Sequence, residues 1–182
     1  TVSVQLSNLE VYTADPVDGY LGDPVWDPYN ETIVCISTLK SSTMSSVVSI
    51  IWDGVQSPKA VEVVRTDDLK VVLDFKDPSL APIHNMTGFI VSFIAYSEYD
   101  SYLAYFYADY DPIEKELSRQ SEVIIESSLR KSARTHLLDD NNIFNSRVIL
   151  AWIDSTEETV IKGMPLNYTG KFEKGKIHTY VN

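Results

Sequence analysis

The chain has 182 residues, 44% of them hydrophobic and 23% charged, which is typical of one globular domain with a sizeable core. Its formal net charge of -11 excludes attraction to a nucleic-acid backbone through the overall field; such a charge attracts basic partners at long range, but on charge alone the better interpretation is an acidic surface that keeps the protein in solution. No apolar run approaches the roughly 18 residues of a membrane-spanning helix, and the first residues show no signal sequence, so we expect no membrane partner.

The first part of the chain predicts β-strands separated by loops. Residues 2–12 alternate between apolar and polar side chains, as in a strand with one solvated face. A loop rich in proline, glycine and aspartate follows at 15–28. Further strands rich in β-branched residues are predicted at 31–37, 47–52, 60–64 and 69–75, the last two as a hairpin, before a second loop at 77–84.

Two aromatic segments, at 89–94 and 102–107, flank a short polar connection and predict a β-hairpin. Both faces of this hairpin carry apolar or aromatic side chains. One face can fill a core, so the other must meet a second layer or a partner, and alternation alone does not decide which face points outwards. After the hairpin, Asp111 and Pro112 predict the start of a short helix at 113–117.

The segment from Glu122 to Leu138 is predicted to be helical. Ile125, Leu129 and Leu137 fall on one helical face with Ala133, and Ser121 is a suitable N-cap. A closing strand is predicted at 146–152. The lysine-rich remainder predicts an appended extension with short β segments at most, so we expect a core domain at 1–154 and a C-terminal extension at 155–182.

Residues suited to catalysis are scattered along the chain. Three histidines stand far apart outside any metal-ligand spacing, and the single cysteine, Cys35, lies in an apolar strand where a buried, unreactive thiol is expected. We therefore expect neither an enzyme nor a bound cofactor or metal. Asn30, Asn85 and Asn167 each begin a glycosylation triplet, which leaves a secreted protein as an alternative.

Several segments, in order, resemble the core domain of the anti-silencing factor family of histone chaperones. The likeness extends over about residues 2–154. The matching segments are VQLSNL at 4–9, TIVCI at 32–36 with Leu39, IIWDG at 50–54, Gly88 with FY at 106–107 and EL at 116–117, and Asn142 with SR at 146–147 and Trp152.

The resemblance implies an immunoglobulin-like β-sandwich with short helices in its loops. It also implies a nuclear, monomeric histone chaperone that binds one histone H3–H4 dimer in nucleosome assembly and disassembly. The family's H3-binding positions fall on Phe89, Val91, Phe93, Phe106 and Tyr107. Its positions for added-strand binding of the H4 tail fall on Leu6, Phe144, Asn145, Ser146 and Arg147. Phe89, Val91 and Phe93 would form an outward apolar row, unless they face a second sheet.

Four positions depart from the family's pattern. Leu103 stands where the family has a histone-binding arginine, and Asn85 where it has an acidic residue. Ser37 and Thr38 replace an acidic pair that receives partner chaperones, so the sequence predicts weak binding of those partners. The alternative from another class is a secreted or surface immunoglobulin-like adhesion or binding module, glycosylated at some of the three triplets.

Overall fold

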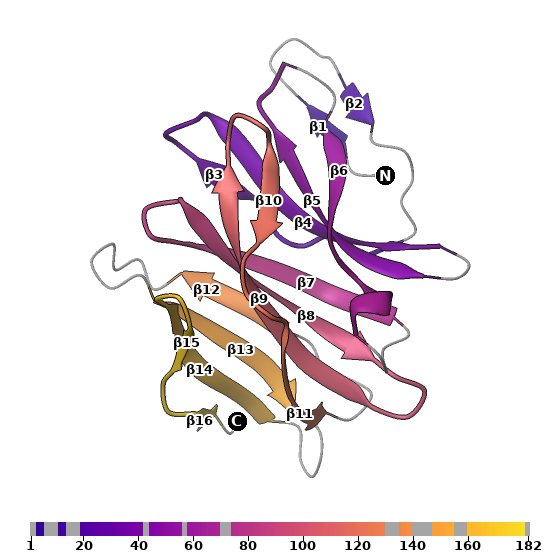
Figure 1. Ribbon diagram of the computed structural model, residues 1–182, viewed down its shortest axis with the longest axis vertical. Coiled ribbons are helices and arrows are strands. Elements are labelled where there is room, and N and C mark those ends of the chain that lie inside the picture. The colour runs from indigo at the N-terminus through magenta and orange to yellow at the C-terminus, as the bar shows by residue number, and fades with distance from the viewer. Residues whose placement is uncertain are drawn as a thin grey trace.

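The computed structural model shows three antiparallel β-sheets that follow one another along the long axis of the molecule (Figure 1). The residues it describes are 3–5, 11–13, 19–41, 44–55, 58–69, 74–129, 135–139, 147–154 and 160–180. Within those ranges the only helical element is the 3-10 turn Thr66–Asp68. The predicted all-β class is confirmed, whereas the short loop helices are not seen in the described ranges.

The first sheet has the order β3-β4-β5-β6. Its two long strands are rich in β-branched residues, which suit a pleated, buried surface. A separate pair, β1 (Ser3–Gln5) and β2 (Val11–Thr13), lies at the same end of the molecule (Figure 1). The strands of the first sheet are β3 (Val25–Asp27), β4 (Thr32–Lys40), β5 (Ser45–Trp52) and β6 (Lys59–Arg65).

The central sheet contains the predicted hairpin as its two middle strands, and Tyr96 pairs with Ser101 beside the connecting turn. The order is β10-β9-β8-β7, and β11 pairs with the other half of the same edge of β9. Its strands are β7 (Asp74–Ile83), β8 (Gly88–Tyr96), β9 (Ser101–Asp111), β10 (Glu116–Arg119) and β11 (Ile124–Leu129).

The third sheet has the order β12-β13-β14-β15, with β16 also paired to β14. Strand β13 pairs along its whole length with β14. The strands are β12 (Thr135–Asp139), β13 (Val148–Asp154), β14 (Val160–Tyr168), β15 (Phe172–Lys174) and β16 (His178–Tyr180).

The central sheet is buried on both faces, so the molecule has two cores. Phe89, Val91 and Phe93 pack in a cluster with the first sheet, whereas Ile90 and Ile94 pack in a second cluster with the third sheet. This alternation follows from the two-residue period of a strand. The second layer that the hairpin's apolar faces required is therefore supplied by the chain itself.

Polar contacts connect the three layers as well. The hydroxyl groups of Thr32 and Tyr110 lie 2.6 Å apart between the first and central sheets. The Leu137 N–H donates to Ser79 Oγ at 3.0 Å between the third and central sheets. Such bonds satisfy polar groups that burial would otherwise leave without water.

Three sequence predictions are wrong in this part of the chain. Of the segment predicted as a helix over 122–138, residues 130–134 lie outside the described ranges, and strands β11 and β12 form on either side of them; the short helix predicted over 113–117 is a turn leading into β10. The helical spacing of apolar residues does not match their burial. Ile125, expected in the core, is 43% exposed, and the buried residues Thr135 and Leu137 alternate with exposed neighbours, as in a strand.

The third wrong prediction is the hairpin of 60–64 with 69–75. Strand β6 pairs with β5 instead. Strand β7 includes most of the residues predicted as a loop at 77–84, and it pairs with β8. The extension predicted at 155–182 also differs from expectation. Its strand β14 is nine residues long, and Met164 and Leu166 belong to the second core.

We predict that Val91→Arg unfolds the protein or lowers its free energy of unfolding by about 3 kcal/mol or more, because it places an unpaired charge between two sheets. Urea denaturation followed by circular dichroism measures the change. The matched control is Ile113→Arg, at a side chain that is 85% exposed, which should change stability by less than about 0.5 kcal/mol. Equal stability of the two variants would contradict the burial of Val91.

Candidate functional site

The predicted H3-binding row does not lie on the surface. Phe89, Val91, Phe93 and Phe106 are all fully buried and face the first sheet. Phe93 makes edge-on ring contacts with Phe75 and Phe106, at centroid distances of 4.9 and 6.2 Å. The predicted outward orientation is therefore wrong, because the first sheet covers this face.

Tyr107, the fifth predicted H3 contact, points to the opposite face of the central sheet. Its ring stacks on Tyr168 of β14 at a centroid distance of 4.1 Å, and its hydroxyl donates to Asp109 at 2.6 Å. Burial, followed by the hydrogen bond and charge of Asp109, raises the pKa of Tyr107 above its ordinary value. The neighbouring Gly88 leaves room for this ring, since an added Cβ would lie 2.3 Å from the tyrosine oxygen. Tyr107 is thus a contact between layers.

A second tyrosine, Tyr105, anchors β15 to the central sheet. Its hydroxyl donates to Glu126 of β11 at 2.6 Å, and Lys174 forms an ion pair with the same carboxylate. The ring of Phe172 meets Tyr105 edge-on at 4.9 Å. Burial raises the pKa of Glu126, but the bonds from Lys174 and Tyr105 outweigh it, so the net shift is downward. Sequence patterns missed this cluster because its members come from three separate strands.

Most of the residues predicted to bind the H4 tail lie outside the described ranges. Leu6, Phe144, Asn145 and Ser146 lie outside the described ranges, and Arg147 is exposed immediately before β13. From Val148 to Trp152, β13 is paired with β12 on one side and β14 on the other. An added strand therefore finds no free edge along these residues of β13.

The position expected to receive partner chaperones, Ser37 and Thr38, is buried beneath the chain's own loop. Tyr20 bonds through its carbonyl to the Thr38 N–H at 2.8 Å and to the Ser37 hydroxyl at 3.0 Å. A Cβ at Gly19 would lie 1.6 Å from the Thr38 carbonyl oxygen, and one at Gly22 would lie 2.4 Å from that of Pro78. The two glycines thus permit this close approach.

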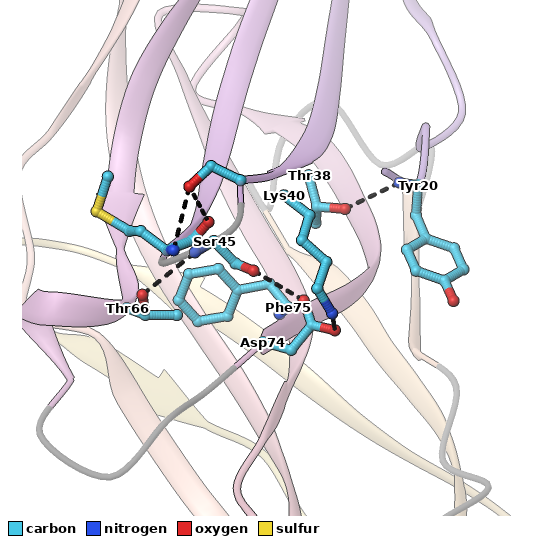
Figure 2. A network of polar contacts seen from close by, with 9 residues as sticks. Tyr20, Thr38, Lys40, Ser45, Thr66, Asp74 and Phe75 are labelled. Carbon is cyan, nitrogen blue, oxygen red and sulfur yellow. Dashed lines mark hydrogen bonds and ion pairs between the residues drawn. The ribbon is translucent and has the colours of Figure 1, made fainter. Parts of the chain in front are cut away.

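Beside this loop lies a shallow polar cavity of about 340 Å³, whose polar network is shown in Figure 2. Asp74 accepts hydrogen bonds from Lys40 at 2.8 Å and from the Ser45 hydroxyl at 2.9 Å. Burial raises the pKa of Asp74, but the bonds from Lys40, Ser45 and the Phe75 N–H outweigh it and hold the pKa below 3.8. A carboxylate held by three donors is suited to joining sheets rather than to accepting a proton.

The remaining candidates for catalysis, the cysteine and the histidines, do not come together in one site. Burial raises the pKa of the Cys35 thiol to about 11, which makes it a poor nucleophile near neutral pH, as expected. His84 bonds through Nε2 to the Tyr168 carbonyl oxygen at 2.7 Å, and His136 faces Asp23. In the described ranges no three potential metal ligands come together.

Four acidic residues come together at the turn between β9 and β10. This acidic turn, which we define by Asp109, Asp111, Glu114 and Glu116, surrounds Ile113, whose side chain is 85% exposed. Asp111 Oδ1 accepts the N–H groups of residues 113 and 114 at 2.8 and 3.0 Å and so fixes the turn. Sequence reasoning placed a helix here and missed the turn, although the Asp-Pro step signalled it.

Comparison with known proteins returned no matching family model, no matching curated protein and no matching solved structure. Among the described residues, none forms a helix long and apolar enough to cross a membrane.

We predict that Asp74→Asn lowers the free energy of unfolding at pH 7 by about 1–2 kcal/mol, because the bonds from Lys40 and Ser45 lose their charged acceptor. The pKa of Asp74 is lower in the folded state, so this stability is present above pH 3.8 and disappears as the pH falls through the folded value. Denaturation curves between pH 2 and pH 7 measure it, with exposed Asp67→Asn as the control. Parallel pH profiles for wild type and Asp74→Asn would contradict the assignment.

Proposed function

We propose that the protein is a histone chaperone that binds a histone H3–H4 dimer, without catalysis, through the acidic turn. The observation that carries the proposal is the composition of this turn, in which residues 109–116 hold four carboxylates around an exposed isoleucine. Histones are strongly basic, so such a turn offers both charge attraction and an apolar anchor. The ordered sequence resemblance over residues 2–154 supplies the class of partner.

Contacts within the turn support this use because they hold it in one conformation. The single lysine of the turn, Lys115, is drawn to Asp53 at the end of β5 and forms an ion pair there. Strand β10 pairs with β9 from Glu116↔Asp111 onward, so the two carboxylates sit directly opposite each other. Like charges placed opposite one another cost stability, and a bound cation relieves that cost.

The proposed binding mode differs from the one that the resemblance implies. An H3 helix cannot reach Val91 while the first sheet covers it, and the arginine position, Leu103, is buried against the third sheet. Contact through the acidic turn needs neither residue. We further propose that the first and central sheets form the family's immunoglobulin-like sandwich, that the third sheet is an addition to it, and that the protein works as a monomer in the nucleus.

We predict that Ile113→Ser combined with Glu114→Lys weakens binding of an H3–H4 dimer at least about tenfold, because it removes the anchor and reverses one charge. Fluorescence anisotropy with labelled dimers measures the affinity at two salt concentrations. The matched control is Glu98→Lys, an exposed residue in the turn at the other end of the hairpin. Absence of binding by the wild type would overturn the function, and equal losses in both variants would overturn the site.

A second candidate is a secreted or surface binding module, and the placement of one glycosylation triplet favours it most. Asn85 lies exposed on a turn, whereas the exposed Asn30 donates through its side-chain amide to Asp27 at 2.7 Å, and the half-buried Asn167 donates to Glu173 at 3.3 Å. Exposed turns are where a glycan is accommodated without disturbing the fold. Mass spectrometry of peptides from the native protein decides between the candidates: glycan mass on Asn30 or Asn85 supports the second, and unmodified asparagines at both positions support the first.

A further inference from the structure

The outer face of the third sheet is apolar, although it points away from both cores. In β13, Val148, Leu150 and Trp152 are buried against the central sheet, so Ile149 and Ile153 point the other way. An antiparallel sheet with one solvated face normally carries polar side chains there. The alternation in β13 instead runs apolar on both sides, as it does in the central hairpin.

The pairing register aligns these outward side chains across neighbouring strands. Ile161 lies opposite Ile153 on one side and opposite Tyr180 on the other, and Ile149 lies between Leu138 and Pro165. Directly opposed residues share a face and touch. We define the outer face as these two rows and the row between them: Ile153, Ile161 and Tyr180; Leu138, Ile149 and Pro165; and His136, Ala151, Gly163 and His178.

Apolar side chains meet over the middle of this outer face, at Gly163. A Cβ at Gly163 would lie 3.5 Å from the Tyr180 ring and 3.7 Å from Ile149, so the two side chains close over the glycine. Leu138, Ile161 and Tyr180 are nonetheless 45%, 49% and 59% exposed. A continuous exposed apolar surface of this kind on a soluble domain marks a binding surface.

The exposed cationic side chains beside the outer face lie at one end of the third sheet. Of the four lysines in residues 160–180, Lys162 and Lys174 lie opposite Trp152 and Leu166 on the inner face, and they form ion pairs with Asp154 and Glu126. Arg147, Lys171 and Lys176 are all exposed, and none forms an ion pair within the described ranges. The acidic groups nearby are Asp23, which faces His136 at 3.5 Å, and Glu173, which accepts from Asn167 and Thr169.

The sign of this rim distinguishes between possible occupants. A second copy stacked face to face about a two-fold axis parallel to the strands would bring Arg147, Lys171 and Lys176 near their own equivalents, and like charges oppose such a contact. A partner that carries carboxylates beside an apolar stripe would satisfy both the rim and the face. An amphipathic helix is about 10 Å wide, enough to cover two or three strands spaced about 4.8 Å apart.

We propose that the outer face of the third sheet binds an acidic amphipathic helix of a partner protein. The helix runs along β13 and β14, so that its apolar stripe crosses the rows of Ile149 and Ile161 and its carboxylates meet the basic rim. This surface is separate from the acidic turn, so the protein has one surface for a basic partner and another for an acidic one.

The test uses two designed 18-residue helical peptides with the same leucine stripe, one with glutamate and the other with lysine on the opposite side. Fluorescence anisotropy with the full chain is expected to show saturable binding of the glutamate peptide and at least tenfold weaker binding of the lysine peptide. Equal affinities for the two peptides, or no binding of either, would overturn the proposal.

Two variants locate the contact. Ile161→Glu should weaken binding of the glutamate peptide at least tenfold, whereas Val55→Glu, at an exposed residue outside both surfaces, should leave it unchanged. Lys176→Glu, a surface change outside the strands, should weaken it about threefold and reduce its salt dependence. Equal effects of Ile161→Glu and Val55→Glu would overturn the proposed contact. A wild-type dimer in sedimentation that Ile161→Glu converts to monomer would show that a second copy is the occupant, and would also overturn the proposal.

Discussion

The whole structure depends on the two-sided apolar character of one hairpin. Strands β8 and β9 place large side chains on both faces, with Phe93 and Phe106 on one and Ile94 and Tyr105 on the other. Each such side chain favours burial by about 1.5–3 kcal/mol, so neither face is stable in water. The chain itself supplies a sheet on each side of the hairpin. Strands β13 and β14 cover the face that carries Ile94 and Tyr105.

This arrangement moves the surfaces available for binding to the two ends of the molecule. The central strip is enclosed, and the edge at Ser37 and Thr38 is occupied by the chain's own residues 19–22. Two exposed surfaces of the described residues are the acidic turn beside the first sheet and the outer face of the third sheet. The acidic composition of the chain as a whole therefore conceals two surfaces of opposite sign, which suit two different partners.

The sequence predicted the hairpin and the need for a second layer, because β-branched and aromatic runs around a polar turn have few other solutions. It could not assign Val91 to a face, because alternation fixes which residues share a face but not what covers it. Ile125 and Leu137 also fit a helical spacing, yet tertiary pairing with β9 and β13 makes them parts of strands. The sequence did not predict the acidic turn or the outer face, because each is formed by residues that strand pairing brings together. The register of that pairing cannot be inferred from a single segment.

The enclosure of β8 between two sheets is tested most directly by nuclear Overhauser effects in a methyl-labelled sample. The account predicts cross-peaks from Val91 to methyl groups of the first sheet, and from Ile90 and Ile94 to those of Leu150 and Leu166. It also predicts that a soluble paramagnetic agent leaves all three β8 residues unaffected. Strong relaxation of Ile90 and Ile94 by the agent, without cross-peaks to β13 or β14, would show that the third sheet does not cover this face.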